Sequence, residues 1–270
     1  MAEKDDALGA LDAAGVLGGM RWAWETTRRQ TLQAYDPETG HDQGWVGYNT
    51  FKVLTDRLDR VFSCNRFALR PGDDPASGED FLAAGLGPQE FESMPRLPAD
   101  LVVYDDLNQS PGWRHSEWRI LLQSYSGHHI DHIPWRQKSK TKQRIAMQPN
   151  PDQLMISAPE LMAFDALFDA EEPRQEGGEP VVTLVGAYAL DAATAESTFY
   201  LGRPRLVKGR REAAWFWREL LLRHDGDGPD LVRLAPLSPP SPAGPTRGLV
   251  EDAPVHIKRT PQARPPETER

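Results

Sequence analysis

The spacing of apolar residues predicts a helical N-terminal part. Residues 48–62 carry the clearest helical pattern, with the apolar face formed by Tyr48, Phe51, Leu54, Leu58, Val61 and Phe62. We expect a polar face opposite, formed by Lys52, Asp56, Arg57, Asp59 and Arg60. Residues 3–17 and 20–35 predict two further helices. A helix-turn-helix interpretation of 20–35 and 48–62 is less favoured than a structural pair, because the connecting loop is long and acidic residues interrupt the second helix.

Downstream of residue 62, shorter patterns predict strands. Residues 65–70 and 100–105 are expected to form strands, and 117–125 fits either a strand or a short helix. Residues 81–91 are ambiguous because Gly85 and Gly87 interrupt any helix. The prolines at 149 and 151 exclude regular structure there, and 154–170 then predicts another helix.

The last patterned stretch predicts a β-hairpin followed by a helix. Residues 181–190 and 197–207 alternate as strands around the turn 191–196, and Pro204 places the second strand at a sheet edge or ends it early. Residues 211–224 predict a strong helix. Since Trp215 and Trp217 cannot both face one core from a helix, one of them is expected to line a groove or an interface.

Together these elements predict an α+β fold. The helical N-terminal part, residues 1–62, is expected to pack on a mixed α+β body, residues 63–235, which ends in the hairpin and its helix. Residues 236–270 are rich in proline and poor in large apolar side chains, so they cannot bury enough surface to offset their ordering entropy. We predict a disordered Pro-rich tail there.

Composition and charge narrow the possible binding partners and cellular compartments. The net charge of −9 over 270 residues repels nucleic acid and anionic membranes, so polyanion binding would need a local patch. The single cysteine, Cys64, excludes an internal disulfide framework and is expected to be a buried thiol. No stretch reaches the roughly 18 apolar residues of a membrane span, and the N-terminus does not resemble a secretory signal. We therefore expect a soluble cytoplasmic protein without a membrane partner and predict no cofactor.

Two clusters of positive charge give the leading functional hypothesis. The first is Trp135, Arg136, Lys138, Lys140, Lys142 and Arg144, and the second is Arg203, Arg205, Lys208, Arg210 and Arg211. Alternating cations on an extended loop would project to one side, and a neighbouring tryptophan could stack on a base. This pattern predicts contact with phosphate, in nucleic acid or another polyanion. The alternative is that both clusters are ordinary solvated loops.

Histidines and carboxylates offer a second chemistry. His128 and His132 would share one face of a helix, as metal pairs require, with His129 and Asp131 between them and His115 upstream. Asp105 and Asp106 end a predicted strand, and Glu117 precedes Arg119 by two residues. Metal-dependent nucleases of the restriction type place acids in a similar order but use a lysine where this chain has Arg119, which cannot act as a base.

Three functions therefore stay open. The chain is a nucleic-acid or polyanion binding protein, a metal-dependent phosphodiesterase or nuclease using Asp106, Glu117 and the histidine loop, or a protein-interaction subunit without catalytic activity that binds a partner through the Pro-rich tail. Convergence of the carboxylates with the histidines in one pocket would favour the enzyme. No Gly-rich phosphate loop, Gly-x-Ser-x-Gly elbow or kinase motif set is present in the sequence.

Overall fold

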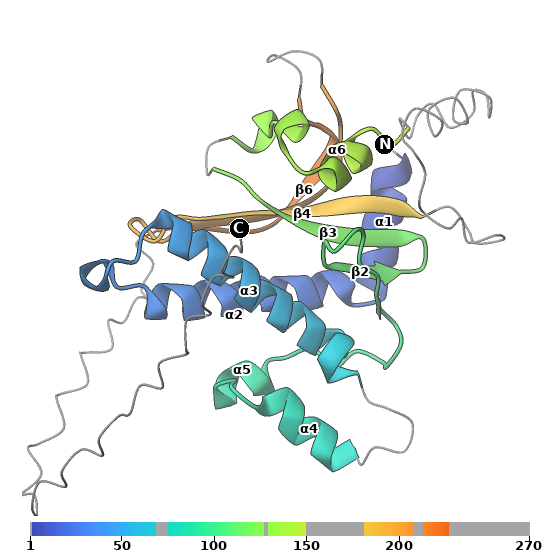
Figure 1. The fold of residues 1–270 in the computed structure, drawn as a ribbon. Coiled ribbons are helices and arrows are strands. Elements are labelled where there is room, and N and C mark those ends of the chain that lie inside the picture. The colour runs from blue at the N-terminus through green and yellow to red at the C-terminus, as the bar shows by residue number, and fades with distance from the viewer. Residues whose placement is uncertain (1, 69–74, 127–128, 150–180, 208–212, 227–270) are drawn as a thin grey trace, which may run out of the picture. The chain divides into compact units, whose positions relative to one another are not determined.

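The computed structural model describes residues 2–68, 75–126, 129–149, 181–207 and 213–226 (Figure 1). The helices are α1 (Ala2–Ala13), α2 (Val16–Ala34), α3 (Gln43–Val61), α4 (Pro75–Ala83), α5 (Pro88–Glu92) and α6 (Lys140–Ala146). Four 3-10 turns are η1 (Pro37–Thr39), η2 (Asn65–Phe67), η3 (Ile130–His132) and η4 (Trp135–Gln137). The strands are β1 (Val103–Tyr104), β2 (Gly112–His115), β3 (Trp118–Ser124), β4 (Val182–Leu190), β5 (Glu196–Pro204) and β6 (Trp215–Asp225).

These elements form an α+β fold, as predicted. The predicted helix at 154–170 and the tail at 236–270 lie outside the described residues, so both stay predictions, as does the division at residues 62 and 235. Among the described helices, none combines the length and the apolar content that crossing a membrane requires.

The three N-terminal helices form where the apolar spacing predicted them. Gly15, with φ of 76°, makes the left-handed turn that separates α1 from α2. Helix α3 begins five residues before the predicted start, because the Asp42 carboxylate accepts a hydrogen bond from the Trp45 backbone N–H and caps the helix there. Helices α2 and α3 pack together against the sheet, so they form a structural pair (Figure 1).

One face of α3 differs from the prediction. Arg57, Asp59 and Arg60 were expected on a solvated polar face, but all three are buried. The segment around α4 and α5 and the start of the sheet cover this face. Arg60 donates to the Leu82 carbonyl at 2.6 Å, and Asp59 accepts from the Trp113 indole N–H at 2.9 Å. Burial of these charges is tolerated because each has hydrogen-bond partners.

The sheet has six strands in sequential order, β1 to β6. All neighbours are antiparallel except β3 and β4, which run parallel with Trp118 opposite Val182. A parallel pair needs a long crossover, and here residues 125–181 supply it, including η3, η4 and α6. The predicted hairpin at 181–190 and 197–207 is confirmed as β4 and β5.

The predicted helix at 211–224 is wrong, because residues 215–225 form the edge strand β6. Two bulges explain why its pattern resembled a helix. Leu222 pairs with Phe199 and Leu220 with Tyr200, which leaves Leu221 as an extra residue, and Phe216 is extra in the same way. The bulge at Phe216 sends Trp215 and Trp217 to opposite faces of the sheet, where each packs against a different core cluster.

Three other short segments were also predicted. Residues 65–67 form the turn η2 instead of starting a strand, with Asn65 in a left-handed conformation at φ of 54°. The strand expected at 100–105 is reduced to β1, because Asp100 also has a positive φ. The sequence of 117–125 fitted either element, and its residues 118–124 form strand β3 because β2 and β4 both pair with them.

The two faces of the sheet carry separate cores. Helices α1, α2 and α3 cover one face, where Trp24 packs against Phe199 and Tyr188 at ring-centroid distances of 5.4 and 5.5 Å. On the other face, Trp135 and Ile145 from η4 and α6 pack against Leu121. Side chains that alternate along β4 supply both cores, with Leu184 and Tyr188 on one face and Val185 and Ala187 on the other.

Candidate functional site

The first basic cluster is helical, not extended. Residues 135–137 form η4, and α6 starts at Lys140 after Ser139, whose hydroxyl accepts a hydrogen bond from the Lys142 backbone N–H. The expected one-sided alternation of cations is therefore wrong. In a helix, residues four apart share a face, so Lys140 and Arg144 point outward together while Lys142 turns toward the sheet.

Trp135 does not offer a ring for stacking on a base. Its side chain is 1% exposed, and its indole N–H donates to the Ala214 carbonyl at 2.8 Å. The ring meets Trp215 edge-on at a centroid distance of 5.4 Å. Trp135 is thus a core residue that fastens η4 to β6, and we remove it from the candidate contacts.

Lys142 is also buried. Its ammonium donates to the Leu122 carbonyl on β3 at 2.6 Å, and the residue is 7% exposed. Burial, and to a smaller extent the positive charge of Lys138, lowers the pKa of Lys142 to about 7. This side chain cannot reach a phosphate on the surface, which corrects its predicted role.

Arg203 is the third predicted phosphate contact that is buried in the structure. It is 3% exposed and donates to the Gln148 side-chain oxygen at 2.9 Å and to the Pro149 carbonyl at 3.3 Å. Burial lowers the pKa of Arg203, and the Glu3 carboxylate on α1 partly offsets this effect. Arg203 joins the end of β5 to the segment that follows α6, so its role in the described structure is to connect elements.

The remaining described cations of the two clusters are not buried. We call this set the basic surface and define it by Arg136, Lys138, Lys140, Arg144 and Arg205. Lys208, Arg210 and Arg211 lie outside the described residues. The two sequence clusters meet because the Leu206 backbone N–H donates to the Ala146 carbonyl at 2.6 Å, which brings the exit of β5 beside the end of α6.

The basic surface has few negative charges along its own segments. Neither 132–149 nor 197–207 contains an aspartate or glutamate. Lys138 is half-buried and the other four cations are exposed, with Arg205 lying over the Phe216 ring at 5.7 Å. A concentration of positive charge raises the local attraction for anions.

The histidine loop does not form a metal site in the part of the chain that the structure describes. His128 lies outside that part, while His129 and His132 are exposed at η3. Asp131 is bound by Arg218, which donates twice at 2.9 Å. No group of three or more metal-ligating side chains comes together among the described residues. His115 lies elsewhere, with Nδ1 2.8 Å from the Leu101 carbonyl oxygen.

The carboxylates of the nuclease hypothesis have other partners. Asp105 accepts two hydrogen bonds from Arg119, at 3.0 and 3.1 Å, and is paired with Arg114 at 2.9 Å. Asp106 accepts from the Gln109 backbone N–H in the turn after β1. Glu117 lies in the turn between β2 and β3, at the other end of these strands.

These acids do not converge with the histidines. Asp105 and Asp106 follow the edge strand β1, whereas η3 contacts β6 at the opposite edge through the hydrogen bond from Trp215 to the Ile130 carbonyl. Strands are spaced about 4.8 Å apart, so the five spacings between β1 and β6 separate the two edges by roughly 24 Å. The nuclease hypothesis loses the shared pocket that it required.

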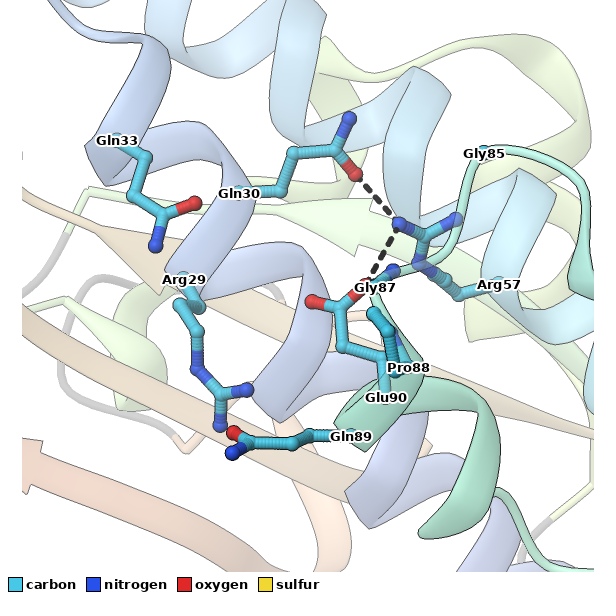
Figure 2. A pocket seen from close by; sticks show the side chains of 9 residues that line it. All are labelled: Arg29, Gln30, Gln33, Arg57, Gly85, Gly87, Pro88, Gln89 and Glu90. Atoms are coloured by element: carbon cyan, nitrogen blue, oxygen red, sulfur yellow. Dashed lines mark hydrogen bonds and ion pairs between the residues drawn. The ribbon is translucent and has the colours of Figure 1, made fainter. Parts of the chain in front are cut away.

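Sequence reasoning missed a pocket of about 390 Å³ on the other side of the molecule. It lies between α2, α3 and the start of α5, and its polar lining includes Arg29, Gln30, Gln33, Arg57, Gln89 and Glu90 (Figure 2). One sequence signal was available. Arg57 lies three residues after Leu54 and one before Leu58, at the border of the apolar face of α3, so it was a candidate for burial.

Comparisons with protein-family models, with curated proteins and with solved structures found no match to this chain.

Proposed function

We propose that this protein binds a polyanion, with nucleic acid as the proposed ligand, through the basic surface. The observation that supports the proposal most directly is the meeting of two basic segments that lie about 60 residues apart in the sequence, through the backbone hydrogen bond between Leu206 and Ala146. A fold that brings separated cations together, in a chain of net charge −9, concentrates attraction for phosphate at one place.

The expected binding mode is contact with the phosphate backbone. Cations that neutralise phosphates release condensed counterions, so binding weakens as salt is added. Since Trp135 is buried, the basic surface lacks the aromatic platform that the sequence suggested. We therefore propose binding without a strong preference for single strands over duplex and without base-specific readout.

The outward pair on α6 makes the test specific. Lys140 and Arg144 are exposed, four residues apart and on the face turned away from the sheet. If both contact phosphate, the double variant Lys140→Gln with Arg144→Gln should reduce the slope of log K against log salt for duplex DNA by up to about two units. The measurement is fluorescence anisotropy with labelled duplex and single-stranded oligonucleotides across a salt series.

A matched control removes the same charge elsewhere. Arg21 on α2 and Lys52 on α3 are on the side of the sheet opposite α6, and the variant Arg21→Gln with Lys52→Gln should keep the wild-type slope. Failure of the wild-type protein to bind at low salt would overturn the proposal. Equal slopes for the two double variants would show that binding does not use the basic surface.

We also propose a cytoplasmic location, which suits a lone reduced cysteine. Cys64 is free and buried, with its thiol donating to the Val102 carbonyl at 3.1 Å. Reducing compartments keep such thiols unpaired. A fluorescent fusion followed by cell fractionation tests this assignment.

A further inference from the structure

The pocket between α2, α3 and α5 has a buried cation in its wall. The Arg57 side chain is 4% exposed, and Figure 2 shows Gln30 and Glu90 pointing toward its guanidinium. The distances from Arg57 Nη2 are 2.7 Å to the Gln30 oxygen and 3.5 Å to a Glu90 oxygen, while Nη1 is 3.1 Å from Asp56. These three side chains orient the guanidinium.

The hydrogen bonding of Arg57 is nevertheless incomplete. Its Nε has no hydrogen-bond partner within the described structure, although it is buried. Burial lowers the pKa of Arg57, with the charges of Glu90 and Asp56 acting in the opposite direction. An arginine stays protonated in proteins, so this site keeps a buried positive charge with an unused donor. A buried donor without a partner is destabilising, and a ligand acceptor that reached this N–H would supply the missing hydrogen bond.

Charge and shape then define the ligand class. Two arginines, Arg29 and Arg57, and one carboxylate, that of Glu90, line the pocket, and Asp56 outside the lining also pairs with Arg57. Arg29 is held only weakly, by Glu25 at 3.7 Å, and its side chain is 45% exposed. Three glutamines, Gln30, Gln33 and Gln89, add amide groups that both donate and accept. A volume of about 390 Å³ lies within the range of small-molecule sites.

We infer that this pocket binds a small molecule that carries an oxyanion, either a carboxylate or a phosphate monoester. Arg29 and Arg57 recognise the anionic group, and the glutamines bind hydroxyl or amide groups on the rest of the molecule. This site is separate from the basic surface, because α2 and α3 cover the face of the sheet opposite α6.

Four probe molecules distinguish a carboxylate ligand from a phosphate ligand. Succinate and lactate carry carboxylates, and inorganic phosphate and glycerol 3-phosphate carry phosphate. Isothermal titration calorimetry should detect at least one of these ligands with a Kd below about 1 mM. The Arg57 Nε–H signal in a ¹H–¹⁵N spectrum should shift on binding. Binding of only one pair assigns the anionic group.

Variants test the site without unfolding the protein. Arg29→Gln alters an exposed side chain and should weaken binding at least tenfold. Arg21→Gln is the matched control, because Arg21 lies on the same helix and is 43% exposed. The double variant Lys140→Gln with Arg144→Gln should bind the probes as the wild-type protein does, which separates this pocket from the basic surface. The inference is overturned if none of the four probes binds, or if Arg29→Gln and Arg21→Gln bind equally well.

Discussion

Replacing Lys142 with methionine should stabilise the protein at low pH and should flatten its stability profile. The ammonium lies 2.6 Å from the Leu122 carbonyl and has no carboxylate partner among the described residues. Methionine fills a similar volume and carries no charge, so it removes the cost of burying the ammonium.

The size of the effect follows from the pKa. Burial lowers the pKa of Lys142 from 10.5 to about 7, and one pKa unit corresponds to about 1.4 kcal/mol. The unfolded chain then binds more protons than the folded chain between pH 7 and 10.5, so the wild-type stability rises with pH in that window. Below pH 7, burial of the charged Lys142 ammonium lowers the free energy of unfolding by its full amount, on the order of 5 kcal/mol. From pH 6 to pH 9, the free energy of unfolding of the wild-type protein should rise by roughly 2–3 kcal/mol more than that of Lys142→Met.

Guanidinium chloride unfolding at pH 6 and pH 9 measures this difference directly. Other titrating groups are common to both proteins, so they cancel in the comparison. Lys140→Met is the matched control, because Lys140 is exposed on the same helix and should leave the profile unchanged. A Lys142→Met profile parallel to that of the wild-type protein would refute the burial of a charged lysine at this position.

Three further predictions concern the core. Gly202→Ala should cost about 1–3 kcal/mol, since its Cβ would lie 2.6 Å from the Trp217 carbonyl oxygen, while Gly47→Ala on α3 meets open space and should stabilise by about 0.5–1 kcal/mol; thermal unfolding compares the two. The Cys64 thiol, whose pKa burial raises to about 12, should react with iodoacetamide at pH 8 about a hundredfold more slowly in the folded protein than in urea, and equal rates would contradict its burial. Burial raises the pKa of Asp59 to about 6 from 3.8, so the folded state binds the extra proton and stability is lost as pH rises from about 4 to 6. In Asp59→Asn, the free energy of unfolding should fall by about 2–3 kcal/mol less between pH 4 and pH 7 than in the wild-type protein, as denaturant melts at the two pH values measure. An equal fall in both proteins would contradict the raised pKa of Asp59.

Local patterns identified elements whose partners lie nearby in the sequence. The spacing of Leu54, Leu58 and Val61 predicted α3, and the two apolar runs around residues 191–196 predicted the hairpin of β4 and β5. Strand β6 was predicted as a helix because the spacing of its apolar residues fits the helical period as well as the strand period. Pairing with the free edge of β5, together with the bulges at Phe216 and Leu221, decided in favour of the strand.

The candidate sites show the same limit more clearly. Sequence alone located the two basic clusters, but it could not show that Trp135, Lys142 and Arg203 turn inward, since that depends on which face of α6 and β5 meets the rest of the fold. It also could not place Arg57 beside Glu90, because that contact joins helices 33 residues apart.

By itself, the sequence determined the α+β class, the N-terminal helices, one hairpin and the position of the positive charge, because helical and strand periods and charge density are properties of neighbouring residues. Tertiary structure decided which cations are buried, that Asp105 and Asp106 lie near the edge of the sheet opposite the edge that η3 contacts, and that a pocket opens at Arg57. These features depend on contacts between distant segments, and packing against such segments overrides the preferences of any single one.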